Sequence, residues 1–202
     1  MKAQLNKLAQ PVDDDAASRL EVLLDELERW NRRINLTAIR NREEMVTAHI
    51  LDSLVARPLL QGREVLDVGT GPGFPGLPLA IVEPDREFTL LDSNNKKIMF
   101  VQHVAGLLGL DNVIAVKGRG EDYAPGHRFD TVIARALAAL QRLVEIAGHH
   151  VREDGVFVAL TGRYPAEELE QFKAPWSYEV TELRVPGLEQ GSRHAVLLRR
   201  NR

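Results

Sequence analysis

The sequence predicts an α/β fold: a mostly parallel sheet with helices on both of its faces. Two observations support this prediction. Short apolar runs alternate along the chain with longer segments that have helical periodicity. The first of these strand-like runs, residues 65–68, ends in a glycine-dense turn, and an apolar helix follows at once. Strand, glycine turn and helix in this order form the opening of a nucleotide-type βαβ unit.

Two helices are expected before the first strand. Three aspartates at 13–15 place negative charge at the start of the first helix, where it favours the helix dipole. The leucines of this segment and Trp30 recur at helical spacing and form one apolar face. Asn41 followed by Glu44 resembles a capping box and predicts a second helix that runs to about Ala56.

The rest of the chain alternates strands and helices without a linker that would divide it. We therefore assign residues 1–60 to an N-terminal helical extension, with a loose lead-in over 1–12, and residues 61–202 to one compact domain. Strands are expected at 63–68, 87–92, 113–117, 129–136 and 154–160, helices at 77–82, 93–110, 140–150 and 167–172, and a final hairpin at 178–185 and 194–199, turning through 186–192.

The turn after the first strand carries the clearest chemical pattern. Glycines at 69, 71 and 73 lack the Cβ atoms that would keep a ligand away from the backbone. The segment fits the dinucleotide pattern G-x-G-x-x-G, which is weak on its own. Prolines at 72, 75 and 78 remove N–H groups that a pyrophosphate would need. A ligand that carries a positively charged sulfonium and no phosphate tolerates the loss of these N–H groups. It also benefits from the nearby carboxylate of Asp67. The plain alternative is a turn that only closes a strand–helix corner.

Four strand ends carry residues suited to one ligand. Asp92 ends the second strand, 23 residues after Gly69, where its carboxylate can accept hydrogen bonds from both hydroxyls of a ribose. Gly120 and Glu121 follow the third strand, and Arg135 ends the fourth. Ligands of such sheets bind beyond the carboxyl ends of the strands, so one cofactor could touch all of these positions.

Two polar segments of the N-terminal region allow more than one interpretation. Three arginines and two asparagines surround Trp30 within residues 29–35, and form either a solvated helix end or a surface for RNA phosphates. His49, Asp52 and Ser53 share one helix face. A catalytic triad is rejected because one short helix face cannot arrange a relay around a nucleophile. Helix capping, docking against the glycine turn and an RNA contact remain open.

Composition excludes several classes of function. With 202 residues, 44% hydrophobic and 27% charged, the chain is typical of a globular protein. It has no cysteine, which excludes disulfides, thiolate metal sites and cysteine nucleophiles, and we expect no metal. No run of 18 apolar residues or signal-peptide core is present, so we expect a cytoplasmic monomer without a membrane partner. The net charge of -3 excludes a general nucleic-acid coat, so RNA would need a local basic cluster.

Four motifs together identify a family resemblance. The chain resembles the RsmG family, also called glucose-inhibited division protein B, from Leu20 to the C-terminal strands. The motifs are Trp30-Asn31-x-x-Ile34-Asn35-Leu36-Thr37, His49-Ile50-Leu51-Asp52-Ser53, Asp67-Val68-Gly69-Thr70-Gly71-Pro72-Gly73-Phe74-Pro75-Gly76 and Ala134-Arg135-Ala136.

The resemblance implies a Rossmann-like class I methyltransferase that uses S-adenosylmethionine, with a seven-stranded sheet and a reversed last strand. It implies methyl transfer to N7 of one guanosine in 16S ribosomal RNA of the small subunit. Phe74 stands where leucine is frequent in the family, and Gly120 where a bulkier residue is usual, so the contact at 120 would be through the backbone.

The resemblance, the strand ends and the two polar segments together give the expected site residues. Guanine N7 carries a lone pair and no proton, so no general base is expected and no side chain is assigned a catalytic role beyond positioning. The cofactor-binding residues are Gly69, Gly71, Phe74, Asp92, Gly120, Glu121 and Arg135, and the RNA-binding candidates are Arg32, Arg33, Asn35, His49, Asp52 and Ser53.

Two rival functions are weighed against this one. A nicotinamide oxidoreductase would need a partner such as Tyr-x-x-x-Lys, and no tyrosine of this chain has a lysine four residues later. A non-catalytic RNA-binding module with a vestigial pocket is disfavoured because Gly69, Asp92 and Glu121 are intact. The motif Asp/Asn-Pro-Pro-aromatic, which enzymes methylating exocyclic amines carry after the fourth strand, is replaced here by Ala134-Arg135-Ala136-Leu137.

Overall fold

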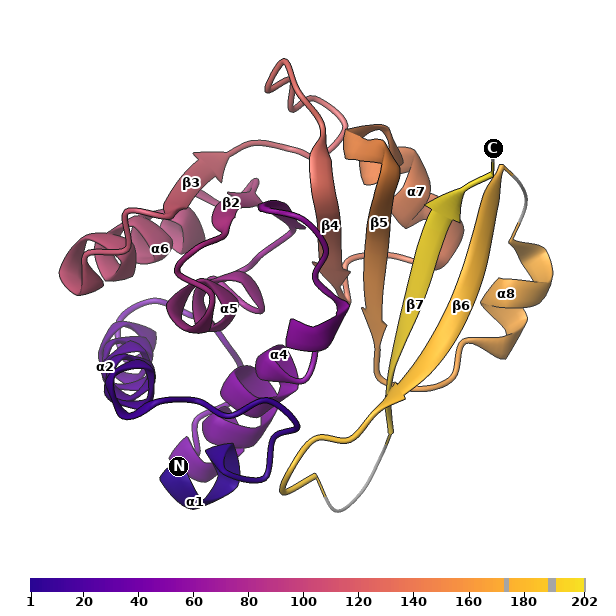
Figure 1. Ribbon diagram of the computed structural model, residues 1–202. Coiled ribbons are helices and arrows are strands. Elements are labelled where there is room, and N and C mark those ends of the chain that lie inside the picture. Colours follow the sequence, from indigo (N-terminus) through magenta and orange to yellow (C-terminus); the bar gives the residue numbers. More distant parts are fainter. Residues whose placement is uncertain (173–174, 189–191, 202) are drawn as a thin grey trace.

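The computed structural model describes residues 1–172, 175–188 and 192–201 and contains a seven-stranded sheet with helices on both faces (Figure 1). The strand order is β3-β2-β1-β4-β5-β7-β6. β7 is antiparallel to both of its neighbours, whereas β1 to β5 are parallel to one another. The strands are β1 Glu64–Val68, β2 Glu87–Asp92, β3 Val113–Lys117, β4 Phe129–Arg135, β5 Val151–Thr161, β6 Trp176–Leu183 and β7 Arg193–Arg200. The predicted mostly parallel sheet with a reversed last strand is confirmed.

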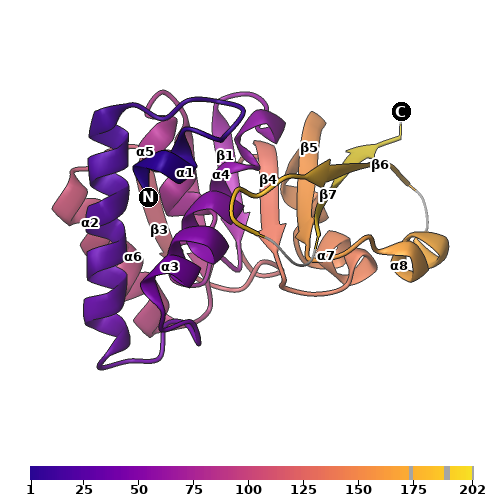
Figure 2. The same cartoon turned by 90° about the horizontal axis from the view of Figure 1, so that it is seen from below.

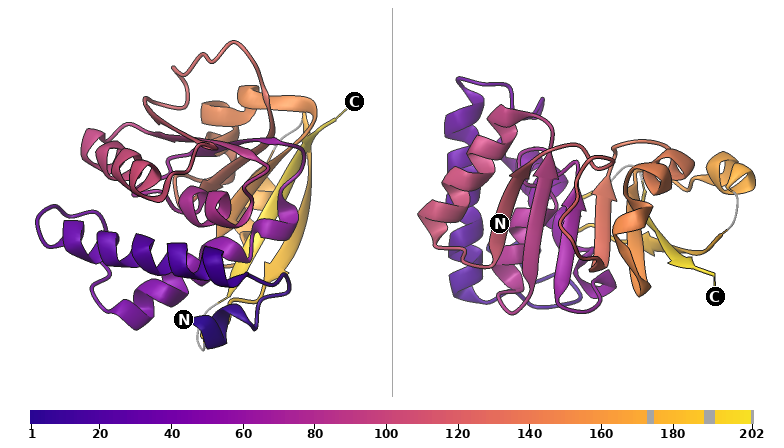
Figure 3. Two further views of the ribbon diagram at one scale, coloured as in Figure 1. Left: turned by 60° about the vertical axis from the view of Figure 1, so that its left-hand side comes forward. Right: turned by 90° about the horizontal axis from the view of Figure 1, so that it is seen from above.

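The helices divide between the two faces of the sheet. The longest, α2, lies beside α6 on the outside of the molecule (Figures 2 and 3). Along the described part of the chain, none of the helices is both long and apolar enough to cross a membrane. The helices are α1 Lys2–Leu5, α2 Asp14–Asn31, α3 Arg42–Met45, a π-helix Val46–Leu51, α4 Asp52–Leu54, α5 Gly76–Val82, α6 Asn95–Leu108, α7 Leu140–Ala147 and α8 Ala166–Gln171, with 3₁₀ turns at Arg57–Leu59 and Gly148–His150.

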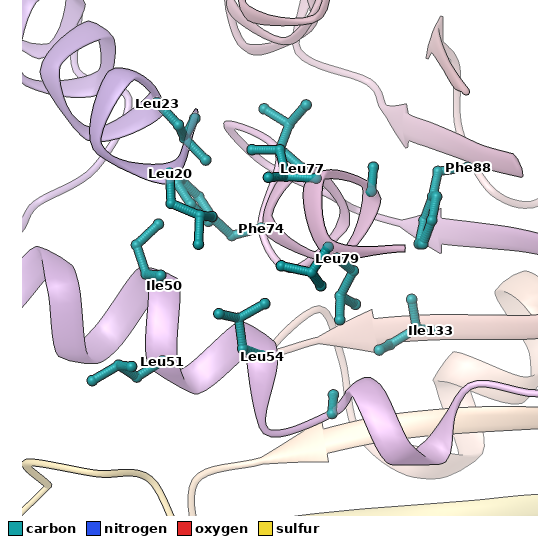
Figure 4. Packing of buried hydrophobic residues seen from close by; sticks show 14 of the residues in the cluster. Leu20, Leu23, Ile50, Leu51, Leu54, Phe74, Leu77, Leu79, Phe88 and Ile133 are labelled. Atoms are coloured by element: carbon teal, nitrogen blue, oxygen red, sulfur yellow. The ribbon is translucent and has the colours of Figure 1, made fainter. Parts of the chain in front are cut away.

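Two hydrophobic clusters fill the spaces on either side of the sheet. The larger joins α2, the π-helix, α4, α5 and α6 to one face. Figure 4 shows part of it, with Leu20, Ile50 and Phe74 converging from three separate segments. The smaller cluster packs α7 and α8 against the opposite face. Central strands buried on both faces explain why their sequences read as continuous apolar runs.

Two predicted helix starts are confirmed by their capping bonds, and one helix ends at a glycine cap. Asp13 accepts a hydrogen bond from the Ala16 N–H at 2.7 Å, and Asn41 accepts one from Glu44 at 3.0 Å. Gly109 ends α6 in the left-handed conformation with φ 59°, which glycine adopts without a Cβ penalty.

Several predicted boundaries are wrong. The lead-in over residues 1–12 was expected to be loose, but it contains the short helix α1. Burial of Leu5 in the larger cluster holds this helix against the domain. The helix after Asn41 widens into a π-helix, and the helix from Leu140 ends at Ala147. Part of the predicted hairpin turn, residues 189–191, lies outside the described residues. The division of the chain at residue 60 stays a prediction.

Candidate functional site

The predicted strand ends meet around a cavity of about 250 Å³ at the carboxyl edge of the sheet. Asp92, Gly69, Gly120 and Glu121 line this first cavity. Gly71 adjoins it, because its N–H donates to Asp92 Oδ2 at 2.9 Å. Phe74 and Arg135 do not line it. The structure therefore brings together five of the seven residues predicted to bind the cofactor, and their binding role stays a prediction.

Asp92 has the geometry to hold two neighbouring hydroxyls. Its Oδ2 accepts from Gly71, and its Oδ1 accepts from the Asn94 N–H at 2.8 Å. An ionised carboxylate has about four lone-pair positions, so each oxygen keeps one for a ligand. The carboxylate is fixed by the turn that it braces, and a ribose diol fits the remaining acceptors.

Asp67 supports the glycine turn from inside the fold. It is 0% exposed, and its Oδ2 accepts from Thr70 Oγ1 at 2.6 Å and from the Gly76 N–H at 2.8 Å. Burial raises the pKa of Asp67 to about 6, although these two hydrogen bonds lower it in part. The Asp67 side chain is enclosed and does not line the first cavity, and its expected benefit to a bound sulfonium stays a prediction.

Residues of α7 and of the 3₁₀ turn that follows it hold the Gly120 turn in place. A Cβ on Gly120 would lie 2.6 Å from Ile146 Cγ2, so the bulkier residue usual in the family would collide here. His150, 2% exposed, lies with its Nε2 2.8 Å from the Gly120 carbonyl oxygen. Glu121 lies on the rim, with Oε1 3.6 Å from Arg142 Nη2. A ligand at this position could therefore contact residue 120 only through its backbone.

A second cavity, of about 360 Å³, holds the other predicted residues. His49, Asp52 and Arg135 line it, together with Arg193 from β7. Asp52 is 7% exposed, and it accepts from Arg135 Nη1 at 2.9 Å and from Arg193 Nε at 2.6 Å. The Asp52 carboxylate thus forms ion pairs with two guanidinium groups. One positive charge is left unbalanced at this cavity.

His49 links the second cavity to the glycine turn. Its ring stacks on Phe74 with centroids 4.7 Å apart and planes at 19°, and its Nε2 lies 3.0 Å from Thr37 Oγ1. Burial, together with the nearby Arg135 guanidinium, lowers the pKa of His49 to about 4, so the ring is neutral at pH 7. Of the three open interpretations of this helix face, docking against the glycine turn is confirmed.

Ser53 is fully buried, and its hydroxyl donates to the His49 carbonyl. It has no surface to present to RNA in this structure. Arg32 and Arg33 are exposed at the end of α2, and the exposed Asn35 accepts a hydrogen bond from Arg40 Nη2 at 2.8 Å. Their proposed contact with RNA, like that of His49 and Asp52, stays a prediction.

A strained residue separates the two cavities. Ala136 has φ 50°, a left-handed conformation uncommon for residues other than glycine, and it lines the second cavity. The next residue, Leu137, lines the first cavity and covers Gly69, where a Cβ would lie 2.8 Å from Leu137 Cδ1. Strain of this kind persists only where surrounding contacts fix it, and it is concentrated at functional sites.

Sequence reasoning missed two residues that shape these cavities, Leu137 and His150, and it did not foresee the pairing of Arg193 with Asp52. Leu137 and His150 carry no pattern that marks them. Arg193 begins a strand whose centre, residues 195–198, is apolar, and its partner Asp52 is 141 residues away in the sequence. An arginine at the mouth of a buried strand is the one signal that could have indicated a polar partner.

Similar solved structures share the fold. A putative O-methyltransferase from Klebsiella pneumoniae superposes with a TM-score of 0.61 at 16% identity, covering 100% of this chain and 96% of that one. A putative methyltransferase from Thermoplasma acidophilum gives 0.55 at 14% identity, covering 69% of each chain. At such identities the likeness establishes the class I methyltransferase sheet.

Sequence relatives are much closer. The ribosomal RNA small subunit methyltransferase G of Idiomarina loihiensis is 45% identical over 198 residues, 98% of this chain and 93% of the relative. That of Aeromonas salmonicida is 47% identical over 186 residues, 92% of this chain and 89% of the relative. The family model for GidB, rRNA small subunit methyltransferase G, matches residues 16–196. The chain therefore belongs to the GidB family of rRNA small subunit methyltransferases.

Proposed function

We propose that this chain transfers the methyl group of S-adenosylmethionine to N7 of a guanosine in 16S ribosomal RNA of the small ribosomal subunit. One observation supports S-adenosylmethionine as the cofactor. The Asp92 carboxylate is fixed beside a glycine turn, and each of its oxygens keeps one acceptor position for a ribose hydroxyl. Family membership supports the acceptor, because the relatives are named for the small subunit RNA. The enzyme acts as a monomer in the cytoplasm and needs no metal.

The residues divide between the two cavities. In the first, Asp92 binds the ribose, Gly69 and Gly71 let the ligand approach the backbone, and Gly120 and Glu121 contact the adenine. Phe74 acts indirectly, by stacking on His49. Arg135 faces the second cavity, so we assign it to the acceptor side together with Arg193. Bound S-adenosylmethionine supplies an activated methyl group on its sulfonium.

The acceptor nitrogen attacks with its own lone pair and has no proton to lose. The chain therefore needs to hold the nucleotide at about 3 Å from the methyl carbon and in line with the breaking bond, which supplies much of the rate. The second cavity adjoins the first across Ala136 and Leu137, and its positive charge suits a polyanionic substrate.

We expect the single-turnover rate, at saturating RNA and cofactor, to be nearly flat from about pH 6.5 to 9, because no side chain has to accept a proton and His49 stays neutral throughout. Rapid-quench measurement of methyl transfer across this range tests the prediction. A log-linear rise that His49→Gln or Glu121→Gln removes would contradict it and would point to an exocyclic amine or a ribose hydroxyl as the acceptor. Loss of a true general base typically costs about 10²–10⁴-fold.

Asp92→Ala is expected to weaken S-adenosylmethionine binding by roughly 30–150-fold, equivalent to about 2–3 kcal/mol of charge-assisted hydrogen bonding. Calorimetry with S-adenosylmethionine, and with NAD as the competing ligand, measures the change. Glu87→Ala is the matched control, because Glu87 stands at the other end of β2 and pairs with Arg63 at the surface. Unchanged affinity in a folded Asp92 variant would remove Asp92 from the site.

The reaction itself is tested with 16S ribosomal RNA from cells that lack the enzyme. We expect one guanosine to gain a methyl group at N7, located by mapping the modified base. Assays with naked RNA and with assembled small subunits identify the form of the substrate. Transfer to another position, or none with either form, would overturn the proposed function.

A further inference from the structure

A pocket of about 500 Å³ lies outside both cavities, where the end of α2 meets the start of α6. Its apolar lining consists of Trp30, Ile34 and Met99, and the remaining lining residues are cations. These are Arg29, Arg33 and Lys96. In a chain with a net charge of -3, this Trp30 pocket combines an aromatic floor with a rim that carries only positive charge.

The Trp30 ring is held in place by its neighbours. It meets Phe100 edge-on, with centroids 5.6 Å apart and planes at 69°, and it lies 5.1 Å from the His103 ring. Met99, which extends from α6, is 50% exposed. A fixed aromatic ring beside an exposed methionine offers a flat, polarisable surface that needs no rearrangement to receive another ring.

The cations around the pocket differ in their freedom. Arg33 and Lys96 are exposed and form no ion pair with any residue that the structure describes. Arg29 pairs with Glu26, which also contacts His103, so it contributes less free charge. Lys97 continues the positive charge toward the first cavity, since its Nζ lies 3.9 Å from the position of a Cβ on Gly71. A cationic path thus leads from the Trp30 pocket to the glycine turn.

We propose that the Trp30 pocket binds an unpaired nucleotide of the RNA substrate, close in sequence to the target guanosine. Its base stacks on Trp30, and the adjoining phosphates contact Arg33 and Lys96. Proteins recognise RNA in this way by stacking splayed-out bases on aromatic side chains while cations follow the backbone. This inference rests on the proposed function, and it adds a binding subsite outside the cavities where cofactor and target base meet.

The first test reads out Trp30 directly. The chain has two tryptophans, and Trp176 is buried in the smaller cluster against Arg200. Trp176→Phe leaves Trp30 as the single fluorophore in an otherwise intact pocket. Titration with a pentaadenylate RNA should quench its emission, and added salt should reverse the quenching. RNA binding seen by anisotropy without any change in Trp30 emission would overturn the proposal.

The second test uses substitutions within the pocket. Trp30→Leu should raise the KM for the RNA substrate by roughly 5- to 150-fold, the range for loss of one stacked base, while Trp30→Phe should recover most of it. S-adenosylmethionine affinity and the rate at saturating RNA should stay at the wild-type level. If Trp30→Leu leaves the KM unchanged while the wild-type enzyme methylates RNA, the pocket is wrong and the proposed function stands.

The cations give an independent readout. Arg33→Gln and Lys96→Gln should each reduce the salt dependence of RNA binding, the slope of log K against log salt, by about 0.7. Arg128→Gln and Lys7→Gln are matched controls, because both residues are exposed and neither lines this pocket. They should leave the slope unchanged. Equal slopes for all four variants would exclude phosphate contacts at this pocket.

If Trp30 is quenched by RNA but the wild-type enzyme methylates no RNA, the proposed function is wrong and the binding site stands.

Discussion

Asp52→Ala is expected to lower the free energy of unfolding by about 3–5 kcal/mol, the usual cost of breaking a buried ion pair from one side. The substitution removes the carboxylate shared by Arg135 and Arg193, whose side chains are 20% and 29% exposed. Both guanidinium groups would then repel each other across the second cavity. Urea unfolding followed by circular dichroism measures the loss.

The same variant should also impair methyl transfer more than cofactor binding, since S-adenosylmethionine is assigned to the first cavity. Asp15→Ala provides the matched control, because Asp15 forms a surface ion pair with Arg19 and such pairs contribute little to stability. If Asp52→Ala were no more destabilising than this control, the two arginines would not depend on Asp52 for their charge balance.

Asp67 and His49 are expected to make opposite contributions to stability in mild acid. The folded pKa of His49 is lowered from 6.5 to about 4, so its contribution is present above pH 6.5 and is lost as the pH falls toward 4. The folded pKa of Asp67 is raised from 3.8 to about 6, so its contribution is greatest below pH 3.8 and is lost as the pH rises through 6. Fully developed, each amounts to about 3 kcal/mol at 1.36 kcal/mol per pKa unit.

In the wild-type protein the two contributions largely cancel between about pH 4 and 6. His49→Gln should leave Asp67 unopposed, so that variant should gain stability relative to wild type as the pH falls. Asp67→Asn should do the reverse and become more acid-labile. The free energy of unfolding, measured in urea at pH 7.0, 6.0 and 5.0 for both variants, gives the two slopes. Contributions from other groups are common to both and drop out of the difference. Parallel slopes would contradict the prediction.

Sequence reasoning predicted the elements that depend on local patterns. Asp13 and Asn41 stand at the two predicted helix starts, and the structure confirms both. β2 and β3 begin and end where their apolar runs do. The π-helix was not predicted, because the widening of a single turn leaves the spacing of apolar residues almost unchanged.

The site was only partly predictable for a related reason. The residues of the first cavity follow strand ends, and parallel strands bring those ends to one edge, so topology alone collected Gly69, Asp92 and Gly120. The second cavity depends instead on contacts between distant segments. Asp52 meets Arg135 and Arg193 across 83 and 141 residues. Tertiary packing sets such pairs, and no periodicity in the sequence encodes them.

The position of β7 has a consequence for how the enzyme is made. This strand lies between β5 and β6 in the sheet but follows both in the chain, and it carries Arg193. During translation the strands around the first cavity leave the ribosome well before residue 193. The second cavity therefore lacks one of its two arginines until residue 193 has left the ribosome. Because a domain folds as a unit and β7 pairs with both β5 and β6, the sheet is complete only when this last strand has emerged and inserted. With the acceptor assigned to the second cavity, we expect methylation of ribosomal RNA by this chain to begin only after its own synthesis has passed β7.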